Sequence, residues 1–583
     1  MLRVRAGTLL AILALIITAC QPSGATQAPA TSGAPATSGA SPSEASAPAS
    51  QPASPSEAGQ PVEGGTLVVG LPGDMVVADP TLVSDSNSSY IMLNVIEGLL
   101  GVKPGTVGEL IPVLAEDLPT VSDDGLTYTF KLRQGIKFHD GTDFNADAVV
   151  ANYERQKNAP EELRDAYNYY FGAVFGWAED SNLASVTAVD ESTVEFKLNA
   201  PQSNFLIAQA PLPQFGIQSP AALEAGDADN PDPAKSPYAQ GQGGTGKSMV
   251  GTGPFMYKEW VPNDHVTIVK NPDYWNPDGA AHLDEAIFKP YPDQAAELNA
   301  LQAGDIDLAQ TIAPNDIAAL ESDPAFQVID RGESCNYGGL QFNQTHPPLD
   351  NLKIRQAIAY AVNKPAYIEA FYAGLAEPAD NWMPPATEFY KALGLPTYDP
   401  DQAKALIAES GLSGDALKIQ FWYPSDVARP YMPDPKGLAE AIASDLEAVG
   451  FTIEFQTAGW RTGYLQDEAL GKYPMWLLGW TCDWAAPDNF LVTAFFHFLG
   501  NDPNPEFAYG PPELKAAFDK GLSATTDEEA KAAWEEAQDI LARDLPTVPL
   551  VHSKPPAAAS ADVKDFLGAG NLNEPLYTVW LDR

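Results

Sequence analysis

The chain has 583 residues, of which 77 are acidic and 33 basic, so its formal net charge is −44. Such a charge argues against a nucleic-acid-binding protein, because affinity for nucleic acid comes largely from lysine and arginine on phosphates. The length suffices for two to four domains, and a hydrophobic content of 45% is typical of a globular body.

The first twenty residues predict export. Arg3 and Arg5 precede an apolar stretch at 9–17 that is too short to span a bilayer. The next letters, ITAC, resemble a bacterial lipobox, in which Cys20 is lipidated and becomes the mature N-terminus. An ordinary signal peptide with an incidental cysteine is the alternative.

Residues 21–63 are rich in serine, proline, alanine and glycine and contain no lysine or arginine. Such a segment cannot bury enough apolar surface to offset its chain entropy. We therefore expect a disordered tether between a lipid and a folded body.

The first half of this body mixes strand and helix patterns. Residues 64–70 are typical of a strand flanked by glycines, and 90–100 have apolar side chains at helical spacing. Apolar residues alternate over 125–132 and again over 193–198, which predicts two half-buried strands.

Residues 241–248, GQGGTGKS, match the P-loop pattern G-x-x-x-x-G-K-[ST]. A working P-loop needs a strand before it and a helix after it. Three prolines precede the match, and Gly251, Gly253 and Pro254 follow it. We therefore expect a flexible insertion, the least ordered part of the body, and no nucleotide binding.

Past residue 330 the pattern changes to amphipathic helices between strands. We expect Asp350 to cap a helix that reaches Val362, and Asp399 to cap another that ends at Gly411. Near the C-terminus, Thr526 and Glu529 have the spacing of a capping box.

A β-α-β unit is predicted between these helices. A strand at 417–422 is followed by a helix at 438–449, which Gly450 ends, and by a strand at 451–455. The body is therefore α/β with mixed sheets.

Motifs of catalysis and metal binding are missing from the sequence. The six histidines are scattered, and HExxH, CxxC and GxSxG do not occur. We therefore expect no metal, no cofactor and no enzymatic activity, with a surface hydrolase or NTPase as the alternative class.

Several stretches resemble one family, the extracytoplasmic solute-binding proteins of ABC importers, family 5, which includes oligopeptide- and dipeptide-binding proteins. The resemblance runs from about 64 to 580 in the family's order. It is carried by DDGLTYTFKLRQGIKFHDGTDFNADAVVANY (123–153), VGTGPF (250–255), NPDYW (271–275), LQAGDIDLA (301–309), FNQTHPPLDNLKIRQAIAYAVNK (342–364), TYDPDQAKALIAESG (397–411) and GWTCDWAAPDNFL (479–491).

The resemblance implies a periplasmic-binding-protein-like flytrap fold, in which two lobes close on a ligand about a hinge near 333 and 552. An extra domain is inserted into the first lobe. The implied parts are the signal peptide at 1–20, the tether at 21–63, lobe I at 64–103, 247–333 and 553–583, the extra domain at 104–246, and lobe II at 334–552.

The resemblance also implies a binding site. In peptide-binding members an aspartate three residues after the motif's tryptophan pairs with the peptide's α-ammonium, and here these residues are Asp483 and Trp480. The alternative is that Asp483 pairs with an arginine or lysine of the protein or caps a turn. Further candidates for the aromatic wall of the cleft are Trp484, Tyr337, Trp382 and Trp422.

Two cysteines remain after lipidation, Cys335 and Cys482. Outside the cytosol they could form a disulfide, and two buried thiols are the alternative. Some peptide binders have a cysteine directly after the motif's tryptophan, where this chain has Thr481. That shift puts a disulfide carried over from the family in doubt.

The function implied is a lipid-anchored, monomeric solute-binding protein on the outer face of the cell membrane. It would deliver peptides to the permease of an ABC importer whose ATPase is cytoplasmic. An oligosaccharide, an opine or a nickel chelate as ligand, or a receptor that only senses its ligand, are the alternatives.

Overall fold

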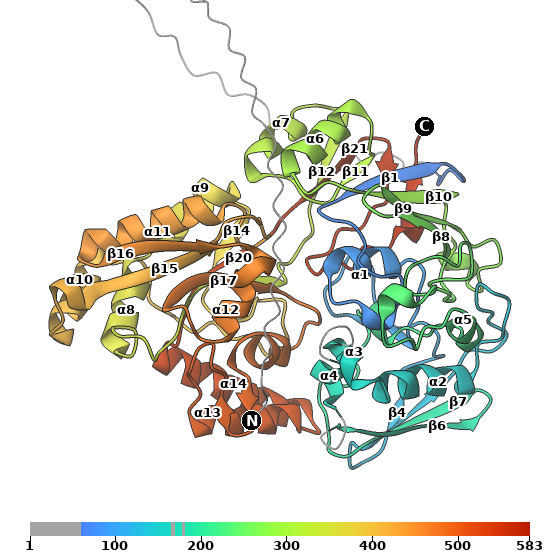
Figure 1. The fold of residues 1–583 in the computed structure, drawn as a ribbon, viewed down its shortest axis with the longest axis horizontal. Coiled ribbons are helices and arrows are strands. Elements are labelled where there is room, and N and C mark those ends of the chain that lie inside the picture. The colour runs from blue at the N-terminus through green and yellow to red at the C-terminus, as the bar shows by residue number, and fades with distance from the viewer. Residues whose placement is uncertain (1–59, 165–168, 178–180) are drawn as a thin grey trace, which may run out of the picture. The chain divides into compact units, whose positions relative to one another are not determined.

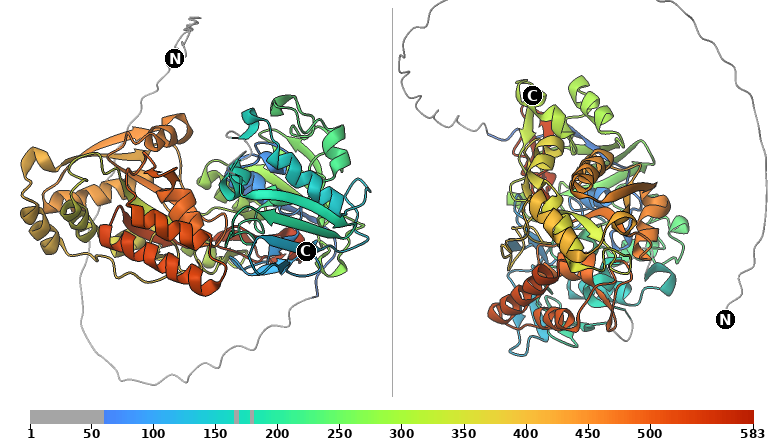
Figure 2. Two further views of the ribbon diagram at one scale, coloured as in Figure 1. Left: turned by 90° about the horizontal axis from the view of Figure 1, so that it is seen from below. Right: turned by 90° about the vertical axis from the view of Figure 1, so that its left-hand side faces the viewer.

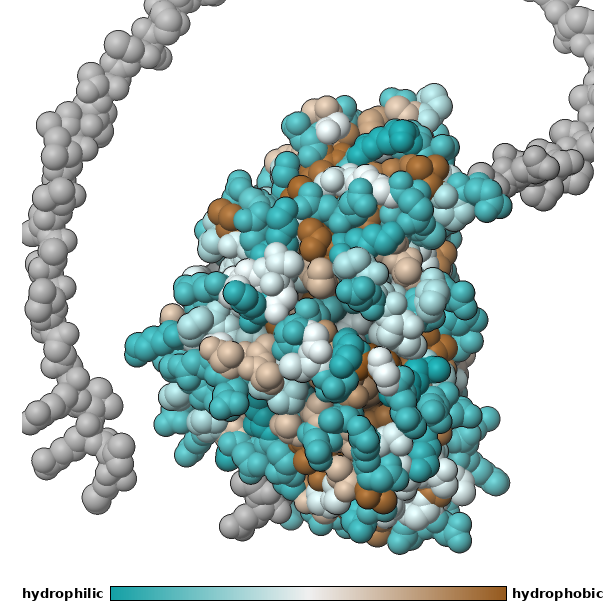
Figure 3. Space-filling view, turned by 90° about the vertical axis from the view of Figure 1, so that its right-hand side faces the viewer, coloured by the Kyte–Doolittle hydropathy of each residue, from teal (hydrophilic) through white to brown (hydrophobic). Residues whose placement is uncertain are grey.

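The computed structural model describes residues 60–583 except 165–168 and 178–180. The signal peptide, Cys20 and nearly all of the expected tether lie outside the described residues. Within the described part, no helix has the length and apolar character needed to cross a membrane. The face drawn in Figure 3 is mostly hydrophilic, with hydrophobic residues scattered over it, in keeping with the many acidic side chains.

The first of three larger sheets has seven strands and collects segments from both ends of the described chain (Figure 1). Strand β1 is parallel to its neighbours β10 and β11, and the other pairs are antiparallel. In spatial order the strands are β12 (Phe326–Ile329), β21 (Ala557–Ser560), β11 (Leu308–Ala309), β1 (Thr66–Leu71), β10 (Glu285–Pro290), β9 (His265–Lys270) and β8 (Phe255–Val261). Helices α1 (Ser86–Met92), α6 (Gln294–Ala303) and α7 (Ile317–Glu321) lie in the same segments of the chain as these strands.

The second sheet has six strands from the region 336–553. In order they are β14 (Ala376–Pro378), β20 (Val548–Ser553), β13 (Asn336–Phe342), β17 (Met475–Thr481), β15 (Lys418–Pro424) and β16 (Thr452–Ala458). Its helices are α8 (Leu352–Ala361), α9 (Lys364–Tyr372), α10 (Pro400–Ser410), α11 (Pro435–Val449), α12 (Leu465–Ala469), α13 (Pro512–Leu522) and α14 (Asp527–Asp544). Helices α13 and α14 pack side by side as a hairpin (Figure 2).

A third, antiparallel sheet has the order β4 (Thr120–Val121), β5 (Thr127–Lys131), β7 (Thr193–Leu198) and β6 (Leu183–Asp190). Its region also holds α2 (Ala146–Lys157), α3 (Glu161–Arg164), α4 (Tyr169–Phe175) and α5 (Pro220–Ala225). Short pairs complete the described fold: β2 (Leu100–Val102) with β3 (Leu110–Pro112), β18 (Phe498–Leu499) with β19 (Asp502–Pro503), and β22 (Val563–Lys564) with β23 (Trp580–Leu581). The predicted α/β class with mixed sheets is confirmed.

Local signals in the second sheet predicted its elements well. Asp399 caps α10 by accepting from the Gln402 amide, and Gly411 ends this helix in the left-handed conformation that glycine adopts without strain. The predicted β-α-β unit is β15, α11 and the parallel strand β16, with Gly450 at the end of the helix.

Two predicted caps differ in detail. Asn351, not Asp350, caps α8, because its side chain accepts from the Lys353 amide. Thr526 caps α14 as predicted, but the Glu529 carboxylate accepts from the Thr525 amide, so the capping box closes one residue earlier. Both shifts are of one residue, the usual scale of error at helix ends.

The helix predicted over 90–100 is wrong beyond Met92, where α1 ends. The Val95 carbonyl accepts from the Gly253 amide, and the Leu99 carbonyl accepts from two amides after β3. A Cβ on Gly251 would lie 2.3 Å from the Val95 carbonyl oxygen, so glycine there permits the close approach. Tertiary hydrogen bonds thus replace the helical ones.

The segment 241–248, which we predicted to be a flexible insertion, is connected to the fold by hydrogen bonds. The Tyr257 hydroxyl donates to the Gly241 carbonyl at 2.7 Å, the Gly243 amide donates to Ser248 Oγ at 3.0 Å, and Ser248 is fully buried. The segment forms turns and leads through 249–254 into strand β8. The strand-before and helix-after arrangement of a P-loop is therefore not formed here.

The chain passes between the two larger sheets twice. It leaves the seven-stranded sheet at Ile329 and enters the six-stranded sheet at Asn336, and it returns between Ser553 and Ala557. Close to the first passage, Cys335 is joined to Cys482 by a disulfide that encloses a loop with a sequence separation of 147.

Breaking this disulfide should destabilise the body considerably. In the chain-entropy model, a closed loop of this length restricts the unfolded chain enough to stabilise the fold by about 5 kcal/mol. Cys335→Ser should therefore lower the urea midpoint of the transition that unfolds the six-stranded sheet. Reductant should lower the wild-type midpoint in the same way and leave that of the variant unchanged; an equal midpoint for both proteins without reductant would contradict the expectation.

Candidate functional site

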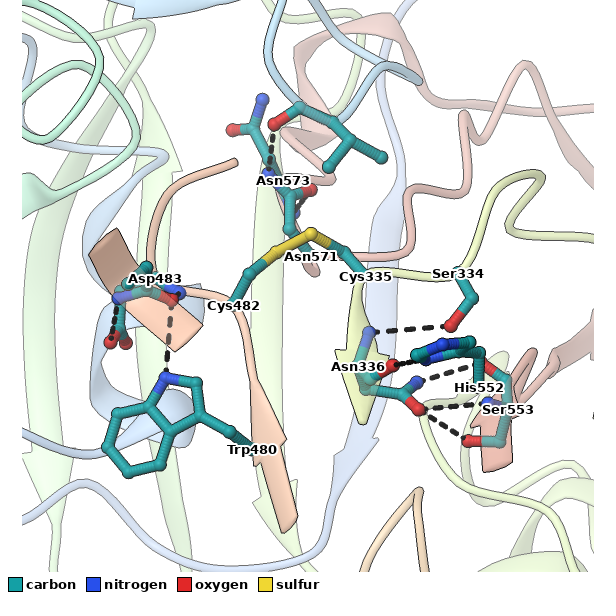
Figure 4. Close-up of a disulfide and its surroundings, with 12 residues drawn as sticks. Ser334, Cys335, Asn336, Trp480, Cys482, Asp483, His552, Ser553, Asn571 and Asn573 are labelled. Carbon is teal, nitrogen blue, oxygen red and sulfur yellow. Dashed lines mark hydrogen bonds between the residues drawn. A yellow bond between two sulfur atoms is a disulfide. The ribbon is translucent and has the colours of Figure 1, made fainter. Parts of the chain in front are cut away.

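The segment that contains Asp483 begins where strand β17 ends. Strand β17 pairs with β13 so that Trp480 faces Tyr337 in register, and the Cys482 amide donates to the Cys335 carbonyl at 2.8 Å. Figure 4 shows the sulfur of Cys482 bonded to that of Cys335, and Cys482 stands between Trp480 and Asp483 in the sequence. Hydrogen bonds and a covalent bond thus fix the backbone on which the candidate carboxylate stands.

Asp483 is a partly buried carboxylate surrounded by neutral donors. The Tyr170 hydroxyl donates to Oδ1 at 2.7 Å, and the Asn489 amide donates to Oδ2 at 3.1 Å. Among the described residues, no lysine, arginine or histidine lies within the 4.0 Å of an ion pair with this carboxylate. Burial raises the pKa of Asp483 to about 6, although these hydrogen bonds act in the opposite direction.

Trp480 lies beside this carboxylate and keeps part of its surface exposed. Its indole Nε1 donates to Asn489 Oδ1 at 3.2 Å. The structure therefore brings together Trp480 and Asp483, the two residues that the motif suggested. Asn489, which the sequence analysis had not considered, contacts both of them.

Three other candidates for the aromatic wall have no exposed surface in this conformation. Tyr337 packs on Phe495, and Trp382 donates its indole N–H to Thr547 Oγ1 at 2.7 Å. Trp484 lies in the apolar core of the four-stranded region. In this conformation all three side chains pack as core residues, because protein atoms cover them completely.

Trp422 remains a candidate. It is half-buried in strand β15 and stacks on Tyr473 with ring centroids 4.1 Å apart and an interplanar angle of 9°. Its buried indole Nε1 has no hydrogen-bond partner among the described residues. A side chain that is partly exposed and has a spare donor can still contact a bound solute.

Arg429 is a residue that the sequence analysis missed. It is half-buried, its guanidinium lies over the Trp460 ring at 4.8 Å from the centroid, and its Nε has no partner. Among the described residues, no carboxylate lies within ion-pair distance of it. A cation stacked on an aromatic ring and left without an anion can receive an anionic group.

Two glycines place the Arg429 loop against the strands that lead to Asp483. A Cβ on Gly338 would lie 2.7 Å from the Tyr431 carbonyl oxygen, and one on Gly479 would lie 2.5 Å from the Tyr431 ring. The loop can therefore cover β13 and β17 only because both positions lack a side chain. The described residues contain no cluster of three or more histidine, cysteine, aspartate or glutamate side chains that could hold a metal ion.

The unpaired carboxylate should cost stability at neutral pH. Because the pKa of Asp483 in the folded protein lies above the ordinary aspartate value of 3.8, its ionisation favours unfolding as the pH rises from about 4 through 6. Asp483→Asn should match the wild type in urea midpoint near pH 4 and exceed it in stability at pH 7. Two pKa units correspond to roughly 3 kcal/mol, an upper limit because the side chain keeps some exposure. A constant difference between the two proteins over this range would contradict the prediction.

Comparisons with known proteins identify the family. Residues 109–502 match the model for bacterial extracellular solute-binding proteins, family 5. The chain is 32% identical to di/tripeptide-binding protein 1 of Pseudomonas aeruginosa, over 79% of this chain and 83% of that protein, and 32% identical to heme-binding protein A of Haemophilus influenzae, over 83% and 86%. It also superposes on the periplasmic binding protein DppA of Helicobacter pylori in complex with the peptide STSA, with a TM-score of 0.75, 28% identity, and coverage of 90% of this chain and 99% of that one. The chain therefore belongs to the extracellular solute-binding proteins of family 5.

Proposed function

We propose that this protein binds peptides outside the cytoplasm and delivers them to the permease of an ABC importer. The observation that carries the peptide assignment is Asp483, a carboxylate with neutral donors on both oxygens and no cation beside it. The α-ammonium of a peptide supplies the missing positive charge. Relatives named for peptides, such as the P. aeruginosa di/tripeptide-binding protein, support this choice.

The electrostatics of Asp483 suit such a ligand. A partly buried carboxylate is costly to ionise without a cation, which is why its pKa is raised. A ligand ammonium at hydrogen-bond distance would favour the charged form and recover part of that free energy. The two neutral donors orient the carboxylate without competing for the place of the cation.

Arg429 is our candidate for the other end of the peptide. Its guanidinium has a free donor, and a peptide's α-carboxylate is a planar acceptor that arginine can bind through two hydrogen bonds. The half-exposed Trp422 and Trp480 would provide apolar surface for peptide side chains, and Trp460 supports the guanidinium from beneath.

The domain organisation completes the proposal. The two lobes would be built on the seven-stranded and six-stranded sheets, with the 104–246 domain beside them. The passages at 329–336 and 553–557 would act as the hinge. A lipid on Cys20 would hold this monomeric body at the outer face of the membrane through the 21–63 tether, where it captures solute without chemical conversion.

A second ligand class has one specific observation in its favour. Heme-binding protein A of H. influenzae is as similar in sequence to this chain as the di/tripeptide-binding protein is. Native mass spectrometry of the purified body would identify a carried ligand, and a heme, sugar or metal chelate in place of a peptide would overturn the peptide assignment.

Replacing the carboxylate should abolish recognition of the ammonium group. We expect Asp483→Asn to weaken binding of a free dipeptide by well over tenfold in calorimetry, because the ammonium loses its counter-charge. The N-acetylated dipeptide should bind the wild type and the variant equally weakly. Unchanged affinity of the variant for the free dipeptide would remove Asp483 from the site.

The role proposed for Arg429 can be tested by changing the carboxyl end of the dipeptide. Arg429→Met keeps most of the side-chain length over Trp460 but removes the charge, so it should weaken binding of a free dipeptide about tenfold. The same variant should bind a C-terminally amidated dipeptide as the wild type does. An equal loss of affinity for both dipeptides would assign Arg429 to packing rather than to the carboxylate.

A further inference from the structure

Asn489 is a fully buried side chain that contacts both proposed ligand residues. It begins the π-helical turn Asn489–Phe496 that follows the 482–488 loop. Its Oδ1 accepts from Trp480 Nε1 at 3.2 Å and from the Asp483 backbone amide at 3.1 Å, and its Nδ2 donates to Asp483 Oδ2 at 3.1 Å. One neutral amide thus holds an indole, a backbone N–H and a carboxylate.

The orientation of this amide is determined by its partners. Two N–H groups converge on Oδ1, which must therefore be the oxygen, and the carboxylate can only accept, so it faces Nδ2. Asn489 is itself fixed, because its backbone amide donates to the Ala486 carbonyl at 3.2 Å. The Asn489 side chain therefore fixes the orientation of the Trp480 indole and of the Asp483 carboxylate.

The orientation of the Asp483 carboxylate depends on hydrogen bonds to both of its oxygens. The Tyr170 hydroxyl reaches Oδ1 from helix α4, and Asn489 reaches Oδ2 from the other end of the 482–488 loop. A hydrogen bond to each oxygen fixes the plane of the carboxylate, which one bond alone would leave free to turn. Asparagine donates without bringing a positive charge, so the position for a cation stays open.

We propose that Asn489 is a positioning residue for the ammonium-binding carboxylate, and that it sets the preference of the site for ligands with a free amino terminus. This inference rests on the proposed function, because it assigns Asn489 a role only if Asp483 receives a ligand cation. An apolar residue at position 489 would leave two N–H groups unpaired and Asp483 free to rotate. The preference for a free amino terminus would then be lost before the affinity for the rest of the peptide.

The test compares the affinities of a free dipeptide and its N-acetylated form, measured by calorimetry on the mature body. The variant is Asn489→Leu, which keeps the number and branching of the side-chain heavy atoms and makes none of the three hydrogen bonds. The matched control is Asn504→Leu. Asn504 is also buried, and its three hydrogen bonds go to Phe495, His497 and Phe507, away from Asp483.

We expect the ratio of the two affinities to fall at least fivefold in Asn489→Leu and to stay within twofold of the wild type in Asn504→Leu. A general loss of packing would lower both affinities together and leave the ratio unchanged, which would overturn the role of Asn489. Should Asn489→Leu fail to fold, Asn489→Ser decides by the same ratio, because it keeps a small polar group but cannot reach all three partners. A wild-type ratio near one would instead refute the proposed function.

Discussion

The buried guanidinium of Arg331 holds together the two passages between the larger sheets. Its Nε donates to Glu574 at 2.6 Å, and its Nη1 donates to the carbonyls of Gln310 and Pro555 at 3.2 and 3.1 Å. Arg331 stands in the first passage and Pro555 in the second, so one cation bonds to both. Removing one partner of such a buried pair typically costs about 3 to 5 kcal/mol, because the other charge remains unpaired. The two passages between the sheets are therefore held against each other at Arg331.

The position of Asp483 is connected to Arg331 through a short covalent path. Cys335 lies four residues after Arg331 and is bonded to Cys482, which precedes Asp483. After Asp483 the chain alternates between two cores: Trp484 and Ala486 pack with the four-stranded region, while Ala485 packs with the six-stranded sheet. The candidate carboxylate is thus held between a covalent bond on one side and a buried tryptophan on the other. Little freedom remains for the backbone that presents it.

The sequence predicted what depends on neighbouring residues and missed what depends on distant ones. Asp399, Gly411 and the β-α-β unit follow from local caps and periodicity, and all were found. The helix over 90–100 failed because Gly253 and the residues after β3 take its backbone hydrogen bonds. Asp483 and Trp480 stand in one short motif, whereas Tyr170 lies 313 residues from Asp483 and no local pattern connects them. Asn489 lies close to the motif in the sequence. Its role appears only in the structure, where its side-chain amide donates to Asp483.

The choice of neutral donors around Asp483 has a consequence for binding. If an arginine of the protein were paired with this carboxylate, a ligand ammonium would have to displace it, and the favourable interaction would already be used. Tyr170 and Asn489 hold the carboxylate in place but compensate its burial only in part, so its pKa stays near 6. The remaining electrostatic cost of ionising Asp483 would be relieved by a ligand cation. On the proposed function, the unpaired carboxylate would cost stability in the free protein, and the same free energy would favour a ligand with a free amino terminus over one without it.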